Sequence, residues 1–192
     1  MFGLDEAALP VRVLRSGGYL FHAGDLAEHI FQVIDGRIRL ERLTTDGKEI
    51  AIHTAQAGTF FAEASLFAER YHCDAVALKT SEIRLYPKKL VLESVRRDPT
   101  AAEGLLALVS RQLQTARFHA ELHGIRSAQA RVMTFLTAHA NAEGRVVIPH
   151  DLQDMALTLR LSREAFYRTL AGLEESGQIK RHGGVIEILK SA

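Results

Sequence analysis

The chain has 192 residues, of which 47% are hydrophobic and 24% are charged, a balance typical of one large or two modest folded domains and not of a disordered chain. It contains no apolar run long enough to span a membrane and no secretory signal at its start, so we expect a cytoplasmic protein with no membrane partner. A single cysteine excludes an internal disulfide and a cluster held by several cysteines, and the net charge of +1 does not by itself indicate a nucleic-acid partner.

Residues 17 to 86 predict an antiparallel β domain. Short runs with alternating apolar residues are separated by turn signals, which include the pairs Asp35-Gly36 and Asp46-Gly47. Asp-Gly pairs tolerate the positive φ values of a two-residue hairpin. Many short strands at this spacing favour an antiparallel sandwich or roll over a parallel sheet, with a small β domain of another topology as the alternative. The expected strands are 19–22, 30–34, 37–43, 49–54, 75–79 and 82–86.

Two helices are expected to follow the β domain. Residues 88–97 predict a short one, and Asp98-Pro99 marks the start of a longer one, with Asp98 as its cap and proline in the first turn, where the missing N–H is not needed. The longer helix is expected to end at Gly124. Apolar residues recur along it with a period near 3.5, which predicts a dimerisation seam; the alternative is a helix that packs on its own β domain. The predicted seam comprises Leu106, Val109, Leu113, Ala116, Ala120 and His123.

The last third of the chain predicts a winged helix-turn-helix. Three helix starts are marked by the polar capping residues Ser127, Asp151 and Ser162. Ser176-Gly177 is expected to end the third helix, and His182-Gly183-Gly184 to turn a hairpin. The expected elements in order are a helix over 128–139, a strand over 146–148, a helix that ends at 157, a turn over 159–161, a helix from 163, and hairpin strands over 179–181 and 185–189.

The third of these helices has two distinct faces. Phe166, Leu170 and Leu173 form an apolar stripe at helical spacing. Four polar side chains share another face, where an arginine can bond a guanine edge and a carboxylate can accept from cytosine N4. The alternative is a solvated face with an ordinary Glu164–Arg168 pair. The predicted base contacts are Arg163, Glu164, Tyr167 and Arg168, and the predicted contacts to the DNA backbone are Ser162, Lys180, Arg181 and His182.

The order of a β-roll, a long helix and a winged helix-turn-helix resembles the CRP/FNR family of bacterial transcription regulators over nearly the whole chain. Arg160 departs from the pattern, because such turns usually carry glycine there; a left-handed backbone costs an arginine about 1 kcal/mol. The pieces that carry the resemblance are Gly18-x-Leu20-Phe21-x-x-Gly24-Asp25, Ile30-Phe31-x-Val33-x-x-Gly36, Gly58-x-x-Phe61-Ala62-Glu63-Ala64-Ser65-Leu66-Phe67, Ala75-x-Ala77, Leu161-Ser162-Arg163-Glu164 with Arg168, and Leu170-x-x-Leu173-Glu174-x-x-Gly177-x-Ile179.

The resemblance implies an α+β protein with three parts: an N-terminal antiparallel β-roll of the jelly-roll, cyclic-nucleotide-binding-like type (1–97), a dimerisation helix (98–125) and a winged helix-turn-helix (126–192). It implies a regulator, not an enzyme, that binds a palindromic operator in double-stranded DNA as a homodimer and activates by contact with RNA polymerase. In that role Arg163 and Arg168 would each bond a guanine, and Glu164 a cytosine. The alternative is a ligand or redox sensor that acts through protein partners without specific DNA binding.

The predicted effector pocket departs from the family members that bind cyclic nucleotides. In those members a glycine precedes a glutamate that accepts from the ribose hydroxyl, and an arginine followed by serine or threonine binds the cyclic phosphate. Here Glu63 remains, but Ala62 precedes it, Cys73 replaces the arginine and Asp74 follows. Loss of the arginine removes about 2–4 kcal/mol, or roughly two to three decades of affinity, so we expect no binding of cyclic AMP at physiological concentrations. The degenerate pocket is predicted to comprise Glu63, Ala64, Cys73 and Asp74.

No cofactor is expected. The iron–sulfur branch of the family uses four cysteines, and this chain has one. Haem ligation by a histidine and a redox role for Cys73 beside a protonated His72 are the alternatives, although Asp74 would raise the pKa of that thiol. The sequence shows no metal-ligand spacing, no nucleophile–base set and no phosphate-cradling glycine loop. The histidines considered as haem ligands are His22, His53, His72, His119 and His123.

Overall fold

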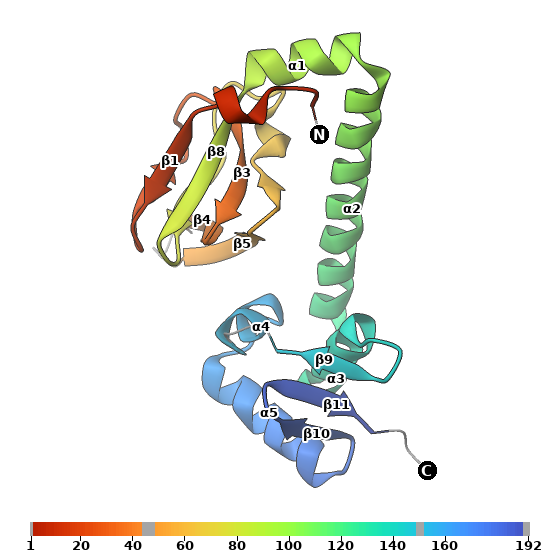
Figure 1. Ribbon diagram of the computed structural model, residues 1–192. Coiled ribbons are helices and arrows are strands. Elements are labelled where there is room, and N and C mark those ends of the chain that lie inside the picture. Colours follow the sequence, from red (N-terminus) through yellow and green to blue (C-terminus); the bar gives the residue numbers. More distant parts are fainter. Residues whose placement is uncertain (1, 44–48, 149–151, 190–192) are drawn as a thin grey trace. The chain divides into compact units, whose positions relative to one another are not determined.

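The computed structural model describes residues 2–43, 49–148 and 152–189 of the chain (Figure 1). The chain divides into two compact units, Met1–Ser110 and Arg111–Ala192. The first holds the strands of the predicted β domain, the short helix after them and the start of the long helix; the second holds the rest of the long helix and the elements after it. The division therefore falls inside the predicted dimerisation helix (98–125) and not at either of its predicted ends. None of the helices described is long and apolar enough to cross a lipid bilayer.

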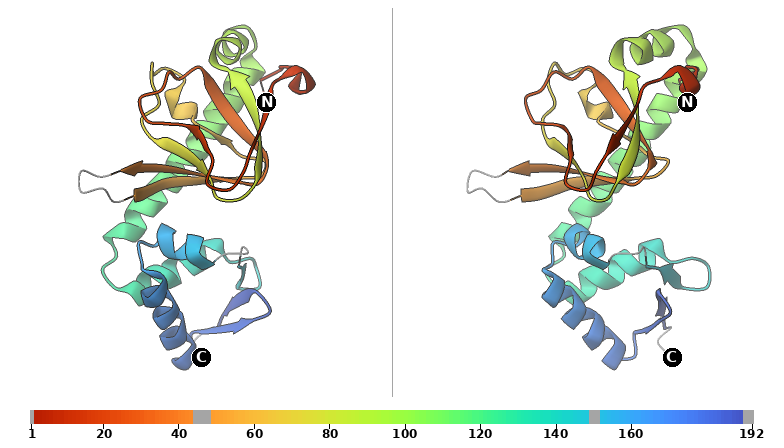
Figure 2. Two further views of the ribbon diagram at one scale, coloured as in Figure 1. Left: turned by 90° about the vertical axis from the view of Figure 1, so that its left-hand side faces the viewer. Right: turned by 60° about the vertical axis from the view of Figure 1, so that its left-hand side comes forward.

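The first unit contains two four-stranded antiparallel sheets. Their apolar side chains share one core, which takes Phe31, Val33 and Ile83 from one sheet and Ile38 and Ala75 from the other. The two sheets therefore form a roll around this core (Figure 2). In spatial order the first sheet holds β1 (Val11–Leu14), β8 (Ser81–Pro87), β3 (His29–Asp35) and β6 (Phe60–Phe61), and the second holds β2 (Tyr19–Phe21), β7 (Asp74–Ala77), β4 (Arg37–Leu43) and β5 (Glu49–Gln56).

Aromatic rings pack at the centre of the roll. Phe21 stacks on Tyr71 with ring centroids 3.8 Å apart, and Phe31 stacks on Phe61 at 5.2 Å. Tyr71 also ties its loop to the start of β3, since its hydroxyl donates to the carbonyl oxygen of His29 at 2.8 Å. A second cluster of buried side chains lies between the roll and the helices after it; it includes Phe2, Tyr86, Val91, Leu105 and Leu108.

The structure corrects part of the strand prediction. Strands β1 and β6 were not expected, and neither were the short 3-10 helices η1 (Glu6–Ala8) and η2 (Glu63–Ser65). The hairpin predicted at Asp35-Gly36 is wrong, because β3 and β4 belong to different sheets and the pair turns the chain from one sheet to the other. Gly36 has φ +103°, and a Cβ on it would lie 2.5 Å from the Cα of Ser81. The turn predicted at Asp46-Gly47 lies outside the described residues.

Helix α1 (Lys88–Arg97) and helix α2 (Pro99–Gly124) follow the roll, as predicted. The cap at Asp98 is confirmed, since its Oδ1 accepts from the backbone N of Thr100 at 2.9 Å. Leu105 and Leu108 near the start of α2 are buried in the first unit. Leu122 near its end is buried in the second unit. Figure 1 shows α2 as one uninterrupted helix. Its side chains contribute to the cores of both units.

The second unit is a helix-turn-helix with a three-stranded antiparallel sheet. The sheet order is β10-β11-β9, and the cores of its helices meet around Val132, Leu136, Phe166 and Leu170. The cap predicted at Ser127 is confirmed, whereas the one predicted at Asp151 lies outside the described residues. The elements are α3 (Ala128–His139), β9 (Arg145–Val147), α4 (Leu152–Thr158), α5 (Arg163–Glu175), β10 (Ile179–His182) and β11 (Val185–Ile188).

Candidate nucleic-acid interface and effector pocket

The turn between α4 and α5 determines how α5 is presented. Arg160 adopts φ +50°, the left-handed conformation expected for this turn. The backbone N of Leu161 donates to the carbonyl oxygen of Ala156 at 2.9 Å, which closes the end of α4. Arg131 of α3 donates through Nη1 to the carbonyl oxygen of Leu159 at 2.6 Å. The turn is thus held to the body of the domain on one side, and α5 leaves it in a fixed direction.

Helix α5 has the two faces that the sequence predicts. Ser162 caps it, with its Oγ accepting from the backbone N of Ala165 at 3.1 Å. Phe166, Leu170 and Leu173 are fully buried and anchor the helix on the domain core. Full burial of a side chain of this size stabilises the fold by about 1.5–3 kcal/mol, so these three residues hold α5 on the core with its opposite face toward solvent.

The four predicted base contacts form two adjacent pairs on α5. The Arg163 guanidinium carbon lies 5.7 Å from the centroid of the Tyr167 ring, an arrangement that allows cation–π attraction. Arg168 Nη1 and Glu164 Oε1 lie 3.8 Å apart, and their side chains are 76% and 90% exposed. An ion pair so exposed stabilises the helix by only tenths of a kcal/mol, so both side chains are available to a partner.

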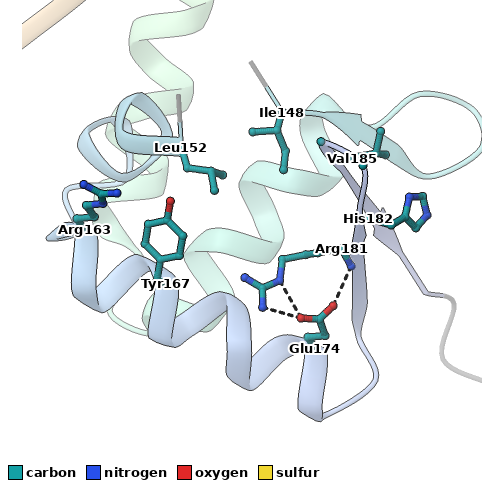
Figure 3. Close-up of a pocket in the computed structure, with 10 residues that line it drawn as sticks. Ile148, Leu152, Arg163, Tyr167, Glu174, Arg181, His182 and Val185 are labelled. Carbon is teal, nitrogen blue, oxygen red and sulfur yellow. Dashed lines mark hydrogen bonds and ion pairs between the residues drawn. The ribbon is translucent and has the colours of Figure 1, made fainter. Parts of the chain in front are cut away.

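A groove of about 780 Å³ separates α5 from the hairpin of β10 and β11 (Figure 3). Arg163, Tyr167 and Glu174 line its α5 side, because residues four and seven apart share one helix face. Ile148 and Leu152 form an apolar part of its wall. The residues that line it are Ile148, Leu152, Arg163, Tyr167, Glu174, Arg181, His182, Gly183, Gly184 and Val185.

Arg181, one of the predicted phosphate contacts, pairs with Glu174 across this groove (Figure 3). Its Nε and Nη2 donate to Glu174 Oε2 at 2.8 and 2.6 Å, and its backbone N donates to Oε1 at 2.9 Å. These hydrogen bonds hold the pKa of the Glu174 carboxyl below its usual range. Lys180 and His182 on either side of Arg181 are exposed, and His182 Nε2 lies 3.4 Å from Glu187 Oε2. The sequence prediction did not include Glu174, because only the fold brings it to Arg181.

At the predicted effector pocket, the backbone before Glu63 keeps the conformation of the family, whereas Asp74 is used elsewhere in the roll. Ala62 has φ +63°, so it adopts the conformation that the glycine of the family would supply. Asp74 is turned toward the loop after β2, where Oδ1 accepts from the backbone N of Ala23 at 2.7 Å and lies 3.3 Å from His22 Nδ1. Ala64 is exposed. The Asp74 carboxylate therefore has a structural role in the roll.

The Glu63 carboxylate lies near His53, which is not part of the predicted pocket. His53 lies opposite Leu40 in the β4–β5 register, so both side chains point to the core face of the sheet. Burial lowers the pKa of the His53 imidazole, and the nearby Glu63 carboxylate opposes that shift. Glu63 Oε2 is buried with no hydrogen-bond partner among the described residues.

Cys73 is buried, and its surroundings favour the neutral thiol, which is the unreactive form. Burial raises its pKa; Arg42 lowers it, and the carboxylates of Asp74 and Glu63 raise it further. The Arg42 side chain is exposed, and its Nε donates to the carbonyl oxygen of His72 at 3.2 Å. The expected effect of Asp74 on the thiol is confirmed in sign, and burial is the larger cause.

Most of the predicted dimer seam is exposed in the single chain. Leu106, Val109 and Leu113 are 68%, 45% and 49% exposed, and Ala116 and Ala120 are exposed as well. His123 differs from them, because its Nε2 lies 3.0 Å from the carbonyl oxygen of Thr158 at the end of α4. Within the described ranges, no three His, Cys, Asp or Glu side chains gather closely enough to hold a metal ion.

Comparisons with known proteins agree with this architecture. Residues 11–98 match the cyclic nucleotide-binding domain. The chain is 30% identical over 185 residues to the cyclic AMP receptor protein of Thermus thermophilus, covering 94% of this chain and 84% of the relative. It is also 30% identical over 192 residues to the nitrogen fixation regulation protein FixK of Azorhizobium caulinodans, covering 91% and 77%.

The solved structure of FixK2 from Bradyrhizobium japonicum has the same fold, with a TM-score of 0.75 at 23% identity over 95% of this chain and 93% of that one. The likeness to the two relatives extends from the β-roll through α2 to the winged helix-turn-helix, which is the order found here. The chain therefore belongs to the CRP/FNR family of transcription regulators.

Proposed function

We propose that this protein is a DNA-binding transcription regulator that reads a palindromic operator as a homodimer. The observation that carries the proposal is the presentation of α5: capped by Ser162, anchored by three fully buried side chains, and exposing two arginines and a glutamate beside a wing. An α-helix that is held in this way fits the major groove of B-DNA.

Base recognition is assigned to the exposed side chains of α5. Arg163 and Arg168 each present a planar fork that can bond O6 and N7 of a guanine, and Glu164 can accept from cytosine N4. Tyr167 can place its ring against a thymine methyl or a phosphate. Sequence preference is expected to come from these four residues, because contacts to phosphate carry no base information.

Contacts to the DNA backbone are assigned to the residues that flank this face. Ser162 and the first-turn N–H groups of α5 can hold a phosphate, as helix N-termini do. Lys180 and His182 are exposed on the wing strand and supply cationic or donor groups. Arg181 is engaged by Glu174, so we assign it a supporting part in this interface.

Dimerisation is assigned to the exposed apolar stripe of α2. Leu106, Val109 and Leu113 repeat at heptad spacing and are exposed in the single chain. Pairing of two such helices would place the two α5 helices for half-sites about one helical turn, or roughly 34 Å, apart. RNA polymerase, the partner of activators in this family, is the proposed second partner. This role places the protein in the cytoplasm, where bacterial DNA lies.

Control by cyclic AMP is not part of the proposal. A phosphate-binding pocket needs a cation at the position that Cys73 occupies, and the thiol there is buried and neutral. His53 and Glu63 remain in the pocket, so another effector, or none, fits these residues. We therefore expect the protein to bind its operator without added cyclic nucleotide.

Selection of bound duplexes from random double-stranded DNA tests the proposal. An enriched palindrome is the expected result, and failure to enrich any sequence would favour a sensor that acts through protein partners. Arg163→Ala is expected to weaken binding to the selected operator by about 1–3 kcal/mol and to relax the sequence preference at one base pair of each half-site. Lys180→Ala is the matched control, because it should weaken binding to all DNA sequences alike. Unchanged affinity and preference in Arg163→Ala would contradict the assignment of this face.

A further inference from the structure

The proposed interface contains a carboxylate in an unexpected place. Glu174 lies on the same face of α5 as Arg163 and Tyr167 and lines the groove between α5 and the wing. A negative charge at a DNA interface repels the phosphate backbone, and nothing in base recognition by the first turns of α5 requires one here. Its place therefore needs another explanation.

Arg181 supplies the cation that pairs with Glu174, and it binds the carboxylate through both its side chain and its backbone. Both its guanidinium and its own backbone N–H donate to the Glu174 carboxylate, over distances of 2.6 to 2.9 Å. Charge-assisted bonds of this length are among the strong ones in proteins. Because the backbone N–H takes part, the carboxylate fixes the path of strand β10 as well as the direction of one side chain (Figure 3).

Because side chains alternate along strand β10, fixing the backbone of Arg181 also constrains the residues on either side of it. Ile179 is buried and Arg181 is half-buried, whereas the side chains of Lys180 and His182, which alternate with them along the strand, are exposed. When the backbone of Arg181 is fixed, the directions of Lys180 and His182 are fixed with it. A glutamate carboxyl is ionised at neutral pH, and the hydrogen bonds from Arg181 lower the pKa of Glu174 further, so the brace is present under ordinary conditions.

We propose that Glu174 is a positioning residue of the DNA interface: through Arg181 it holds the wing against α5, so that Lys180 and His182 reach phosphate while α5 reads the bases. Arg181 is then the link in this brace and not itself a phosphate ligand. The inference rests on the proposed DNA-binding function and adds to it a residue outside the base-contacting and phosphate-contacting sets.

Operator binding by Glu174→Gln, measured over a range of salt concentrations, tests the inference. The variant is expected to bind the selected operator about tenfold more weakly than wild type, and its plot of log affinity against log salt should be shallower by about 0.9 for each phosphate that the wing no longer reaches. Glu175→Gln is the matched control, since it removes the same charge from the neighbouring exposed position and should bind at least as tightly as wild type.

The double variant Glu174→Gln/Lys180→Ala separates a positioning role from a merely stabilising one. If Glu174 acts through the wing, adding Glu174→Gln to Lys180→Ala should weaken binding by a smaller factor than adding it to wild type, because the Lys180 substitution has already removed one of the two interactions with phosphate that Glu174 positions. Additive losses would overturn the inference. Tighter binding with a steeper salt slope in Glu174→Gln would also overturn it, since Arg181 would then be a phosphate ligand that Glu174 withholds.

Thermal melting of each variant accompanies these titrations. If Glu174→Gln is unfolded at the assay temperature, Arg181→Lys replaces it under the same criteria, because lysine keeps a cation and the backbone N–H bond but loses the planar fork. Failure of the wild-type protein to bind any enriched palindrome would contradict the proposed function. Normal binding by wild type and by Glu174→Gln alike would contradict only the role of Glu174.

Discussion

Among the residues that the structure describes, two other than glycine adopt left-handed backbone, and each stands where the CRP/FNR pattern has glycine. Ala62 has φ +63° before Glu63, and Arg160 has φ +50° in the turn before α5. The fold keeps the geometry of both positions while the side chain has changed. For an L-residue that geometry costs about 1–2 kcal/mol relative to ordinary helical backbone, and a glycine is free of that penalty.

Arg160→Gly is therefore expected to stabilise the protein by about 1 kcal/mol, because the strain in the turn is relieved. The loss of backbone freedom on folding reduces this gain but does not exceed it. Urea denaturation of both proteins measures the difference. Arg160→Ala is the control, since it removes the same side chain and keeps the strain; equal stability of the glycine and alanine variants would contradict the explanation.

Gly36 shows the opposite case, in which no other residue fits. A Cβ at this position would lie 2.2 Å from Ser81 Oγ and 2.5 Å from the Cα of Ser81. Gly36→Ala is expected to destabilise the roll by about 3 kcal/mol or more, because backbone strain and a backbone clash add. Gly58→Ala is the control: Gly58 also has positive φ, at +83°, but a Cβ there would meet nothing within 4 Å. Equal losses in the two variants, measured by denaturation, would exclude the clash as a cause.

At the scale of elements, α2 exposes a stripe of apolar side chains that another helix would normally cover. Leu113 is 49% exposed on the predicted seam, and an apolar side chain that repeats at heptad spacing is normally covered by another helix. Leu113→Lys is expected to convert the proposed dimer to monomer, because two like charges would meet at the seam. Sedimentation velocity checks this. Gln114→Lys, one position along the helix and also exposed, should leave the dimer unchanged; dissociation in both variants would exclude the seam.

The wing is expected to respond to acid through Glu174. Its folded-state pKa lies below its ordinary value, so the stabilisation from the pair with Arg181 is fully present above pH 4.5 and is lost as pH falls through the lowered pKa. The difference in unfolding free energy between wild type and Glu174→Gln should therefore shrink toward zero in that acid range. A difference that stayed constant from pH 7 to pH 3 would show that charge plays no part in it.

Local elements could be predicted from the sequence, whereas pairing between distant strands could not. The caps at Asp98, Ser127 and Ser162 are confirmed because a capping side chain bonds backbone only two or three residues away. The hairpin predicted at Asp35-Gly36 is wrong because the choice between pairing β3 with β4 and pairing it with β8 depends on residues about 50 positions apart. An Asp-Gly signal specifies the bend but not its partner strands.

At the scale of the whole molecule, the family and fold could be predicted, and the predicted site residues remain a proposal. The two residues that the sequence prediction left out of these sites, His53 in the pocket and Glu174 at the wing, owe their places to tertiary register. His53 faces the core because it pairs with Leu40, and Glu174 meets Arg181 because β10 folds back along α5. Neither residue type signals such a role by itself.

Cyclic AMP is expected to change neither the melting temperature nor the operator affinity of the protein at physiological concentrations. The physical reason is the neutral, buried thiol of Cys73 where a phosphate needs a cation. Isothermal titration calorimetry and melting curves measure this directly. Cys73→Arg restores a cation at this position and should raise the affinity for cyclic AMP roughly tenfold or more. Binding of cyclic AMP by wild type at low-micromolar concentration would contradict the prediction.

The sharing of α2 between two cores has a consequence for cooperativity. Leu105 and Leu108 are buried with the β-roll, and Leu122 is buried with the winged helix-turn-helix, on one helix of 26 residues. A segment of about a dozen residues is only marginally helical in water without packing. When either core unfolds, the half of α2 that packs on it loses its support. The remaining half is then a short helix, which is less stable and supports the other core less well. We expect the two units to lose structure in a single thermodynamically coupled transition, so that a destabilising substitution in the roll also lowers hydrogen-exchange protection beside α5.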